Sequence, residues 1–403
     1  MPAVARGGLV GVICGPRLRS AGSAGVSMST RTWPTRERRE SNPIFSDRKL
    51  KFGSFQTNLD SACIMSDLEG RHHITWPNTV ACAKLADEME FEAIVPVARW
   101  RGFGGKTNPQ GPGFETYTWA AGLGALTQRP SIFATSHVPM YHPIVSAKQS
   151  TVIDHITNGR FTLNIVAGWN KPEIDMFGTE MLPHDERFAV AEEWLTIIKR
   201  LWTEDEFDFT GKYYKIRKGY LEPKPIQKPY PALMNAGGSE RGRHFCAKNC
   251  DVAYVAFPSN EPDDCKRHVD AYRNLARGEY GRALQVWATA YIVQGETEKE
   301  ALEFHDYYVN QKGDWEAAEG VIETIGLNAK TFAPERLAKM QSSFIAGWSG
   351  FPLVGTKEQV VDKMTMLSKA GCDGLMISWP RYEEGMRNFQ TTTLPLLKQA
   401  GLR

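Results

Sequence analysis

The feature that most constrains the fold of this chain is a regular alternation of short apolar runs with helical segments, from about residue 51 onward. The run FEAIVPV (91–97) is typical of a strand that is buried on both faces. The segment 184–202 places Leu195 and Ile198 on one face of an amphipathic helix. Eight strand–helix units joined by right-handed crossovers close into a barrel. We therefore predict an α/β fold, a (β/α)8 TIM barrel with insertions.

The barrel is expected over residues 51–403, with two insertions. The segment FDFTGKYYKIRKGYL, within about 206–222, predicts a hairpin around Gly211. Residues 314–355, rich in Gly, Phe and Trp, form the second expected insertion. The expected strands are 51–58, 91–97, 131–137, 161–166, 232–236, 251–255, 285–294 and 374–379, and the main expected helices are 76–90, 114–126, 144–156, 184–202, 262–276, 298–310 and 357–370.

The first 50 residues have a different composition from the rest of the chain. They carry nine Lys/Arg and three Asp/Glu, and residues 1–35 hold no acidic residue. We predict a disordered extension at residues 1–50, which is either an organellar transit peptide or an overlong start that begins upstream of Met28. We favour the overlong start, because no long amphipathic stripe of arginines develops.

Composition excludes several classes of function. Residues 51–403 carry 39 Lys/Arg and 43 Asp/Glu, so the body is mildly acidic and offers no basic stripe for nucleic acid. No run of about 18 apolar residues is present, so we expect no membrane span. The seven cysteines are scattered and odd in number, which favours reduced, buried thiols in a cytoplasmic protein.

In a TIM barrel the functional residues follow the carboxyl ends of the strands. Gly237-Gly238-Ser239 follows the fifth expected strand and precedes a helix, so it is either a phosphate seat or simply a turn with a helix cap. The other polar or notable residues at strand ends are Ala98, Arg99, Thr135, His137, Asn164, Trp169 and Glu173.

Several familiar motifs are absent or do not fit. RGFGGKT (101–107) matches neither G-x-x-x-x-G-K-[ST] nor G-x-G-x-x-G, so we interpret it as a flexible active-site loop. No H-x-H pair ends a strand, and the adjacent His72 and His73 point to opposite sides of an extended segment, so no metal site is expected. No G-x-S-x-G elbow is present.

Together these segments resemble the bacterial luciferase-like, flavin-dependent monooxygenases. RGFGGKT is close to the pyrimidine monooxygenase branch, whereas HDERF and EPKPIQ are closer to the dimethylsulfone and alkanesulfonate monooxygenase branches. The likeness runs from about Lys51 to the C-terminus. The segments that carry it are ITNGRFTLNIVAGWNKPE (156–173), HDERF (184–188), FTGKYYKI, EPKPIQKPYP (222–231), NAGGS (235–239) and PLVGTKEQV (352–360).

The resemblance implies reduced FMN (FMNH2) as cofactor and O2 as co-substrate, with a separate NAD(P)H:flavin reductase and a homo-oligomeric assembly. Where pyrimidine-type members commonly carry Arg-Tyr, this chain has Arg187-Phe188 and lacks that hydroxyl. By matching motifs, the residues implied to bind the cofactor are Ala98, Arg99, Asn164, Glu173, Arg187, Phe188 and Ser239.

The implied reaction is oxidation of a small molecule with cleavage of a C–S or C–N bond, in a sulfone, sulfonate or N-heterocycle. Thr135 and Asn164 are candidate hydrogen-bond donors to flavin N5 or to the oxygen being transferred. His137 is a candidate proton donor, because the reference pKa of histidine lies near neutrality. The alternatives are a core role for His137 and a strand role for Thr135. Trp169 and Trp379 are either walls for flavin or substrate, or packing residues.

Two other functions fit the same barrel. One is a deazaflavin-dependent dehydrogenase, which would transfer a hydride without O2. The other is a flavin-binding protein without catalysis. Oxygen uptake with FMNH2 distinguishes the first from a monooxygenase, and turnover distinguishes the second.

Overall fold

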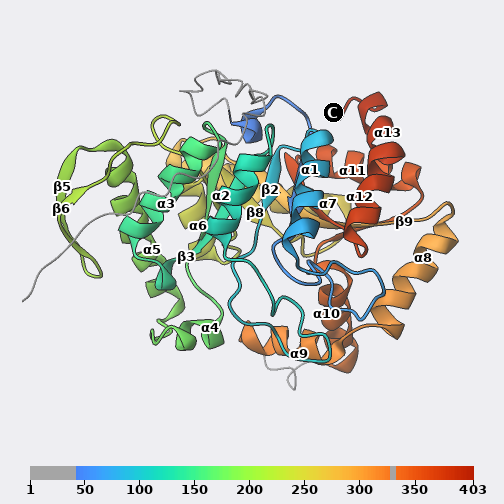
Figure 1. Ribbon diagram of the computed structural model, residues 1–403. Coiled ribbons are helices and arrows are strands. Elements are labelled where there is room, and N and C mark those ends of the chain that lie inside the picture. The colour runs from blue at the N-terminus through green and yellow to red at the C-terminus, as the bar shows by residue number, and fades with distance from the viewer. Residues whose placement is uncertain (1–41, 327–332) are drawn as a thin grey trace, which may run out of the picture. The chain divides into compact units, whose positions relative to one another are not determined.

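The computed structural model describes residues 42–326 and 333–403. Within them, eight parallel strands form a closed barrel in the ring order β1, β2, β3, β4, β7, β8, β9 and β11, which the pairing of β8 with β9 completes. Each barrel strand is followed by a helix that packs outside the ring (Figure 1). The predicted (β/α)8 TIM barrel is confirmed.

The strands of the barrel lie close to the segments expected from sequence. The prediction of β3 (Ser131–His137) and of β4 (Phe161–Val166) matches the structure to the residue. The other strands are β1 (Lys51–Phe55), β2 (Ala93–Val95), β7 (Ala232–Asn235), β8 (Val252–Val255), β9 (Gln285–Gln294), β10 (Phe351–Gly355), β11 (Gly374–Ser378) and the hairpin strands β5 (Glu206–Thr210) and β6 (Lys215–Tyr220).

The helices bury one face against the barrel and expose the other. In α5 (His184–Thr203) the buried face includes Trp194, Leu195 and Ile198, the periodicity from which this helix was predicted. The others are α1 (Trp76–Glu88), α2 (Thr116–Leu126), α3 (Pro143–Ile156), α4 (Lys171–Met176), α6 (Glu240–Asn249), α7 (Pro262–Tyr280), α8 (Glu298–Asp306), α9 (Trp315–Thr324), α10 (Pro334–Gly347), α11 (Lys357–Lys369), α12 (Tyr382–Thr391) and α13 (Thr393–Gln399).

The segment 314–355, expected as an insertion, contains α9, α10 and a strand that was not predicted. This strand, β10, pairs in parallel with the second half of β9, from Phe351 opposite Ala290 to Gly355 opposite Gln294. The long β9 explains the difference: its first residues pair with β8, and its last residues extend beyond β8 and provide an edge for β10. α9 and α10 lie at the same end of the barrel as α4 (Figure 1).

Part of the expected N-terminal extension is folded onto the barrel. Residues Pro43–Phe45 form a short 3-10 helix, and Ile44 is fully buried in the cluster that fills the barrel interior. Asn42 donates a hydrogen bond to the carbonyl of Phe161 at 3.0 Å. The folded part of the chain therefore includes residues from 42 onward, rather than from 51, because the Ile44 side chain packs into the barrel interior. Residues 1–41, on which the rest of that prediction falls, lie outside the described residues.

Candidate active site

A cavity of about 640 Å³ opens at the carboxyl ends of the barrel strands. Its wall combines apolar and aromatic side chains with a few polar groups, the usual composition of a small-molecule site. Strand ends contribute Phe55, Thr135, His137, Asn164, Met234 and Tyr254, and the loops and helices beyond them contribute Arg99, Trp169, Lys171, Arg187, Phe188, Gly237, Gly238, Ser239, Glu323 and Trp348.

The Gly-Gly-Ser turn lies on one side of this cavity, at the start of α6. The Ser239 hydroxyl caps the helix by accepting a hydrogen bond from the backbone N–H of Gly242 at 3.1 Å. A side chain at Gly237 would collide with Gly242, whereas the space beside Gly238 is open. The turn thus leaves room for a ligand directly in front of a helix N-terminus, where N–H groups and the helix dipole favour an anion.

Arg187, in the first turn of α5, faces the same part of the cavity. One of its guanidinium nitrogens donates to the carbonyl of Gly168, and its Nε is buried without a hydrogen-bond partner. Its neighbour Phe188 is buried and packs against Phe245 of α6, with ring centroids 5.8 Å apart. Arg187 is therefore available to an anion beside Ser239, and Phe188 fixes α5 against the helix that carries the turn.

Arg99, in the loop after β2, is a buried cation that lines the cavity. Its Nε donates to Gln110 at 3.2 Å and one Nη donates to Glu173 at 3.3 Å. Three aromatic rings surround the guanidinium group, with centroids 4.8 to 5.8 Å from its central carbon, namely Phe103, Trp169 and Trp348. Cation–π contacts and one carboxylate thus hold Arg99 in place.

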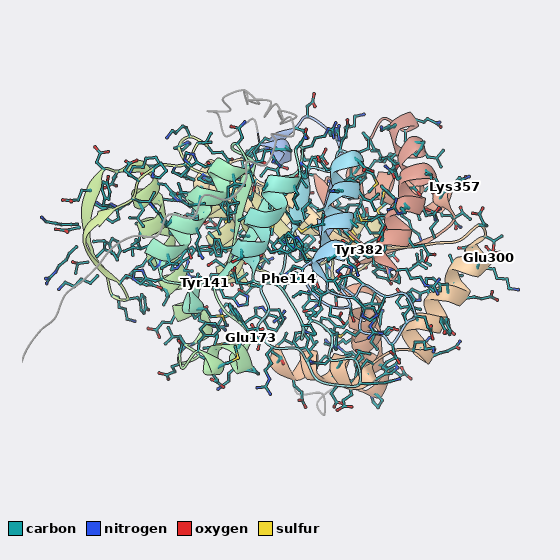
Figure 2. The ribbon with its side chains drawn as sticks, viewed as in Figure 1. Phe114, Tyr141, Glu173, Glu300, Lys357 and Tyr382 are labelled. Carbon is teal, nitrogen blue, oxygen red and sulfur yellow. The ribbon has the colours of Figure 1, made fainter. Side chains whose placement is uncertain are left out.

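Glu173 lies in the first turn of α4 and is labelled in Figure 2. It pairs with Arg99 but is not part of the cavity wall. Its side chain is fully buried. One carboxylate oxygen accepts the backbone N–H groups of Trp100 at 2.7 Å and of Arg101 at 3.2 Å, in addition to Arg99. Glu173 therefore shapes the loop after β2 and neutralises Arg99. Ala98, the residue before Arg99, is buried and is not part of the cavity wall.

His137, at the end of β3, does not titrate near neutrality. Burial and the neighbouring charge of Arg99 lower its pKa from 6.5 to about 3. Its Nδ1 lies 3.7 Å from a carboxylate oxygen of Glu173, beyond hydrogen-bond distance, and neither atom has another partner among the described residues. The imidazole is therefore neutral at pH 7, and the expected proton donor with a pKa near neutrality is wrong on that point.

Thr135 and Asn164 lie side by side on β3 and β4, which pair in parallel with these two residues opposite each other. The Thr135 hydroxyl donates to the carbonyl of Pro96 at 2.7 Å, and the Asn164 amide nitrogen donates to the Thr135 oxygen at 3.1 Å. The amide oxygen of Asn164 is buried without a partner. The barrel register thus brings together two of the three candidate catalytic residues.

Comparison with known proteins identifies the family. Residues 53–374 match the family model of the luciferase-like monooxygenases. The chain belongs to this family. It is 28% identical over 356 residues to the FMNH(2)-dependent dimethylsulfone monooxygenase of Pseudomonas putida, and this alignment covers 87% of this chain and 96% of the Pseudomonas putida protein. It is 27% identical over 355 residues to the pyrimidine monooxygenase RutA of Acinetobacter baylyi, which covers 86% and 95% of the two chains.

A solved structure of a long-chain alkane monooxygenase has the same fold as this luciferase-like monooxygenase. It superposes with a TM-score of 0.78 at 21% identity over 88% of this chain and 92% of its own. The resemblance inferred from the sequence motifs is confirmed, and the protein is an enzyme of the monooxygenase class. No helix in the described parts of this monooxygenase is long and apolar enough to cross a membrane.

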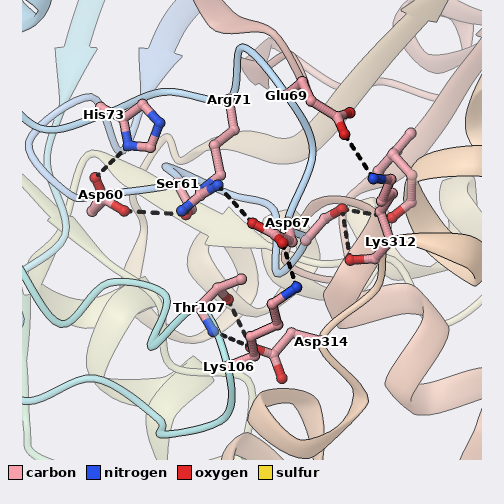
Figure 3. Close-up of polar contacts among 12 residues, drawn as sticks. Asp60, Ser61, Asp67, Glu69, Arg71, His73, Lys106, Thr107, Lys312 and Asp314 are labelled. Atoms are coloured by element: carbon pink, nitrogen blue, oxygen red, sulfur yellow. Dashed lines mark hydrogen bonds and ion pairs between the residues drawn. The ribbon is translucent and has the colours of Figure 1, made fainter.

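In this luciferase-like monooxygenase the RGFGGKT loop is held in place by the late insertion (Figure 3). Asp314, which caps α9, accepts hydrogen bonds from both the backbone N–H and the hydroxyl of Thr107, at 2.6 and 2.7 Å. Lys106 pairs with Asp67 at 2.5 Å, and a side chain at Gly105 would collide with Asp314. These contacts differ from the expectation of a flexible loop, because they anchor the segment that places Phe103 over Arg99.

Several residues of the cavity wall carry no signal in the sequence. Phe55, Met234 and Tyr254 end strands that were predicted, but an apolar strand end carries no signal of function. Trp348 follows α10, and only the aromatic richness of 314–355 pointed toward it. Trp379, expected as a possible wall, instead packs against Tyr382 and Phe389 and does not line the cavity.

Proposed function

We propose that this protein is an FMNH2- and O2-dependent monooxygenase that oxidises a small organic molecule and cleaves a C–S or C–N bond, in a sulfone, sulfonate or N-heterocycle. The observation that carries the proposal is a single cavity with two polar regions. One is a candidate anion-binding site at Ser239 and Arg187, and the other is the buried pair of Thr135 and Asn164. The named dimethylsulfone and pyrimidine monooxygenases support it, because each aligns over nearly its whole length.

The residues present fit FMN. The phosphate would be held by Ser239, by the free N–H groups of α6 and by the Nε of Arg187, which has no partner of its own. The rings would lie against the apolar wall of Phe55, Met234 and Tyr254. The unpartnered amide oxygen of Asn164 supplies one polar contact to such a ligand.

Reduced FMN supplies the chemistry of O2 activation, which side chains alone do not provide. The protein has to bind and orient both ligands and exclude water. Asn164 and Thr135 fix the hydrogen-bonding character of one wall. Arg99 is held in place by Glu173 and the aromatic rings. His137 is neutral, and its imidazole does not change its protonation near pH 7.

Charge balance narrows the class of substrate. Arg99 and Glu173 have side chains 1% and 0% exposed and form a compensated pair, while Lys171, Arg187 and Glu323 line the cavity from α4, α5 and α9. Because Glu173 already compensates Arg99, an anionic substrate beside this guanidinium would add a second buried negative charge to one buried cation, which is costly. Within the proposed classes, uncharged sulfones and N-heterocycles are therefore favoured over sulfonates.

We also propose a separate NAD(P)H:flavin reductase as the source of reduced flavin, a cytoplasmic location and a homo-oligomeric state. The exposed surface of α2 and α3 supports the last point, because Leu126, Val145, Val152 and Ile156 are 41 to 49% exposed there. Light scattering of the purified protein tests it: Val152→Asp should convert an oligomer into monomer, and a wild-type monomer would contradict the proposal.

The function is tested by supplying FMN, NAD(P)H and a flavin reductase under air with dimethyl sulfone, methanesulfonate and uracil in separate reactions. We expect consumption of one uncharged compound in proportion to O2, with little H2O2. Hydride transfer with a reduced or oxidised deazaflavin in the absence of O2 would favour the dehydrogenase alternative. Flavin binding with H2O2 as the sole product for every compound would contradict the proposed reaction.

A further inference from the structure

The hydroxyl of Tyr272 holds the Gly-Gly-Ser turn from the side that faces away from the cavity. Tyr272 lies on α7, is 1% exposed and does not line the cavity. Its hydroxyl donates its single proton to the carbonyl oxygen of Gly237 at 3.1 Å. The Gly237 carbonyl therefore points into the protein, away from the space that a ligand would occupy.

The other end of the same peptide group faces the cavity. The peptide bond between Gly237 and Gly238 is trans, and the C=O and N–H of a trans peptide point in opposite directions. Because Tyr272 binds the carbonyl, the N–H of Gly238 is directed toward the open space beside this residue. Within residues 42–326 and 333–403, neither this N–H nor that of Ser239 meets an acceptor.

Asn235 fixes the peptide group that precedes this one. Its side-chain oxygen accepts the N–H of Gly237 at 2.8 Å, and its amide nitrogen donates to the carbonyl of Ile165 on β4 at 2.6 Å. The N–H of Gly237 is therefore already used. Asn235 and Tyr272 together leave Gly238 as the first residue of the turn whose N–H is free for a ligand.

Arg187 is an independent sign that an anion binds on this side of the cavity. It belongs to α5, not to the turn or to α6, and it lines the same cavity. Its Nε is buried and has no partner among the described residues. A buried guanidinium N–H without an acceptor is costly, and an anion in front of the turn would satisfy it.

We propose that Tyr272 is a positioning residue that makes the turn select a phosphate-bearing flavin, which rests on the proposed function. A phosphate group at pH 7 is negatively charged and only accepts hydrogen bonds, so it binds the N–H of Gly238 and is repelled by the carbonyl of Gly237. Glycine on both sides of this peptide allows either orientation at little cost. The hydroxyl of Tyr272 stabilises the orientation that favours an anion.

The matched variants are Tyr272→Phe and Tyr308→Phe. Each removes one buried hydroxyl that donates to a backbone carbonyl, because Tyr308 is fully buried and donates to Ala346 at 2.8 Å. Tyr308 does not line the cavity, so its variant reports the loss of such a bond elsewhere in the fold. In Tyr272→Phe the peptide between the two glycines is free to turn over, and a fraction of the molecules then presents a carbonyl to the ligand.

The experiment is an anaerobic titration of the full-length protein with dithionite-reduced FMN and with dithionite-reduced riboflavin. Binding is followed by the quenching of tryptophan fluorescence, since Trp169 and Trp348 line the cavity. Riboflavin has the same rings but a hydroxyl in place of the phosphate, and a hydroxyl bonds to either end of a peptide.

We expect the wild type to bind FMN more tightly than riboflavin. Tyr272→Phe should weaken FMN binding about five- to tenfold, the effect of one hydrogen bond on an equilibrium, and leave riboflavin binding unchanged. Tyr308→Phe should change neither affinity.

The two ligands separate a positioning role from a structural one. Equal weakening of FMN and riboflavin in Tyr272→Phe would overturn the inference, because Tyr272 would then only support the fold, and an unchanged affinity for FMN would overturn it as well. Equal affinity of the wild type for FMN and riboflavin, which needs no variant, would overturn the inference but leave the use of a flavin intact. A wild type that binds neither flavin would refute the proposed function itself, and the inference with it.

Discussion

Replacing Glu173 by alanine should destabilise the protein strongly, because it breaks a pair that is buried on both sides. The side chains of Arg99 and Glu173 are 1% and 0% exposed, and the carboxylate also accepts the backbone N–H groups of Trp100 and Arg101. Removing one partner of a buried ion pair costs about 3–5 kcal/mol, since the other charge is left uncompensated. With a urea m-value of about 3 kcal/mol/M, the unfolding midpoint should fall by about 1 M or more.

Equilibrium urea unfolding, followed by tryptophan fluorescence, measures this effect. Glu69→Ala is the matched control: Glu69 also pairs with one cation, Lys312 at 2.6 Å, but both side chains are solvent-accessible, so no measurable change is expected. The double variant Arg99→Met/Glu173→Leu should recover part of the loss, because it leaves no unpaired charge but still removes the acceptor of the Trp100 and Arg101 N–H groups. If Glu173→Ala unfolds at the same urea concentration as Glu69→Ala, the account of Arg99 and Glu173 as a buried pair is refuted.

Three further predictions concern the cavity. Asn164→Ala should slow substrate oxidation and divert reduced flavin to H2O2, and unchanged turnover and coupling would remove Asn164 from the mechanism. Ser239→Ala should weaken binding of FMNH2 with little change in the chemical step, and it should cost about 1 kcal/mol of stability as a lost helix cap; equal affinity by titration would refute the phosphate seat. The pKa of His137 is about 3 in the folded state and 6.5 in the unfolded state. Between these two pH values the unfolded state binds one more proton, so the folded state loses stability as the pH falls from 6.5 toward 3. Between pH 7 and pH 5 His137 should contribute about 2 kcal/mol of this loss, and His137→Gln should remove it in urea unfolding at the two values; an identical pH dependence in the variant would show that His137 is not buried and neutral.

The barrel was predictable because its periodicity is local. β3, β4 and α5 are encoded in runs of six to twenty residues, where a short run that is buried on both faces or an apolar stripe with a 3.6-residue period is visible directly. β10 was not predictable in this way, because its partner is the far half of β9, more than fifty residues earlier in the chain. Strand pairing over such a distance leaves no local pattern.

The site shows the same division between local and distant signals. Strand ends brought Thr135, Asn164 and Ser239 to the cavity, as the barrel rule predicts. The depressed pKa of His137 depends on burial beside Arg99, which residue type and position do not reveal. The place of Glu173 behind Arg99 rather than on the wall depends equally on how α4 packs against the loop after β2.

The measurement that tests the proposed activity most directly is oxygen-isotope incorporation. The protein is supplied with reduced FMN from a flavin reductase under 18O2, with small uncharged sulfones and pyrimidines as substrates, and the products are analysed by mass spectrometry. The account predicts a product that carries one 18O atom for each reduced flavin consumed. Products without 18O, or reduction of O2 to H2O2 alone with every compound, would contradict it.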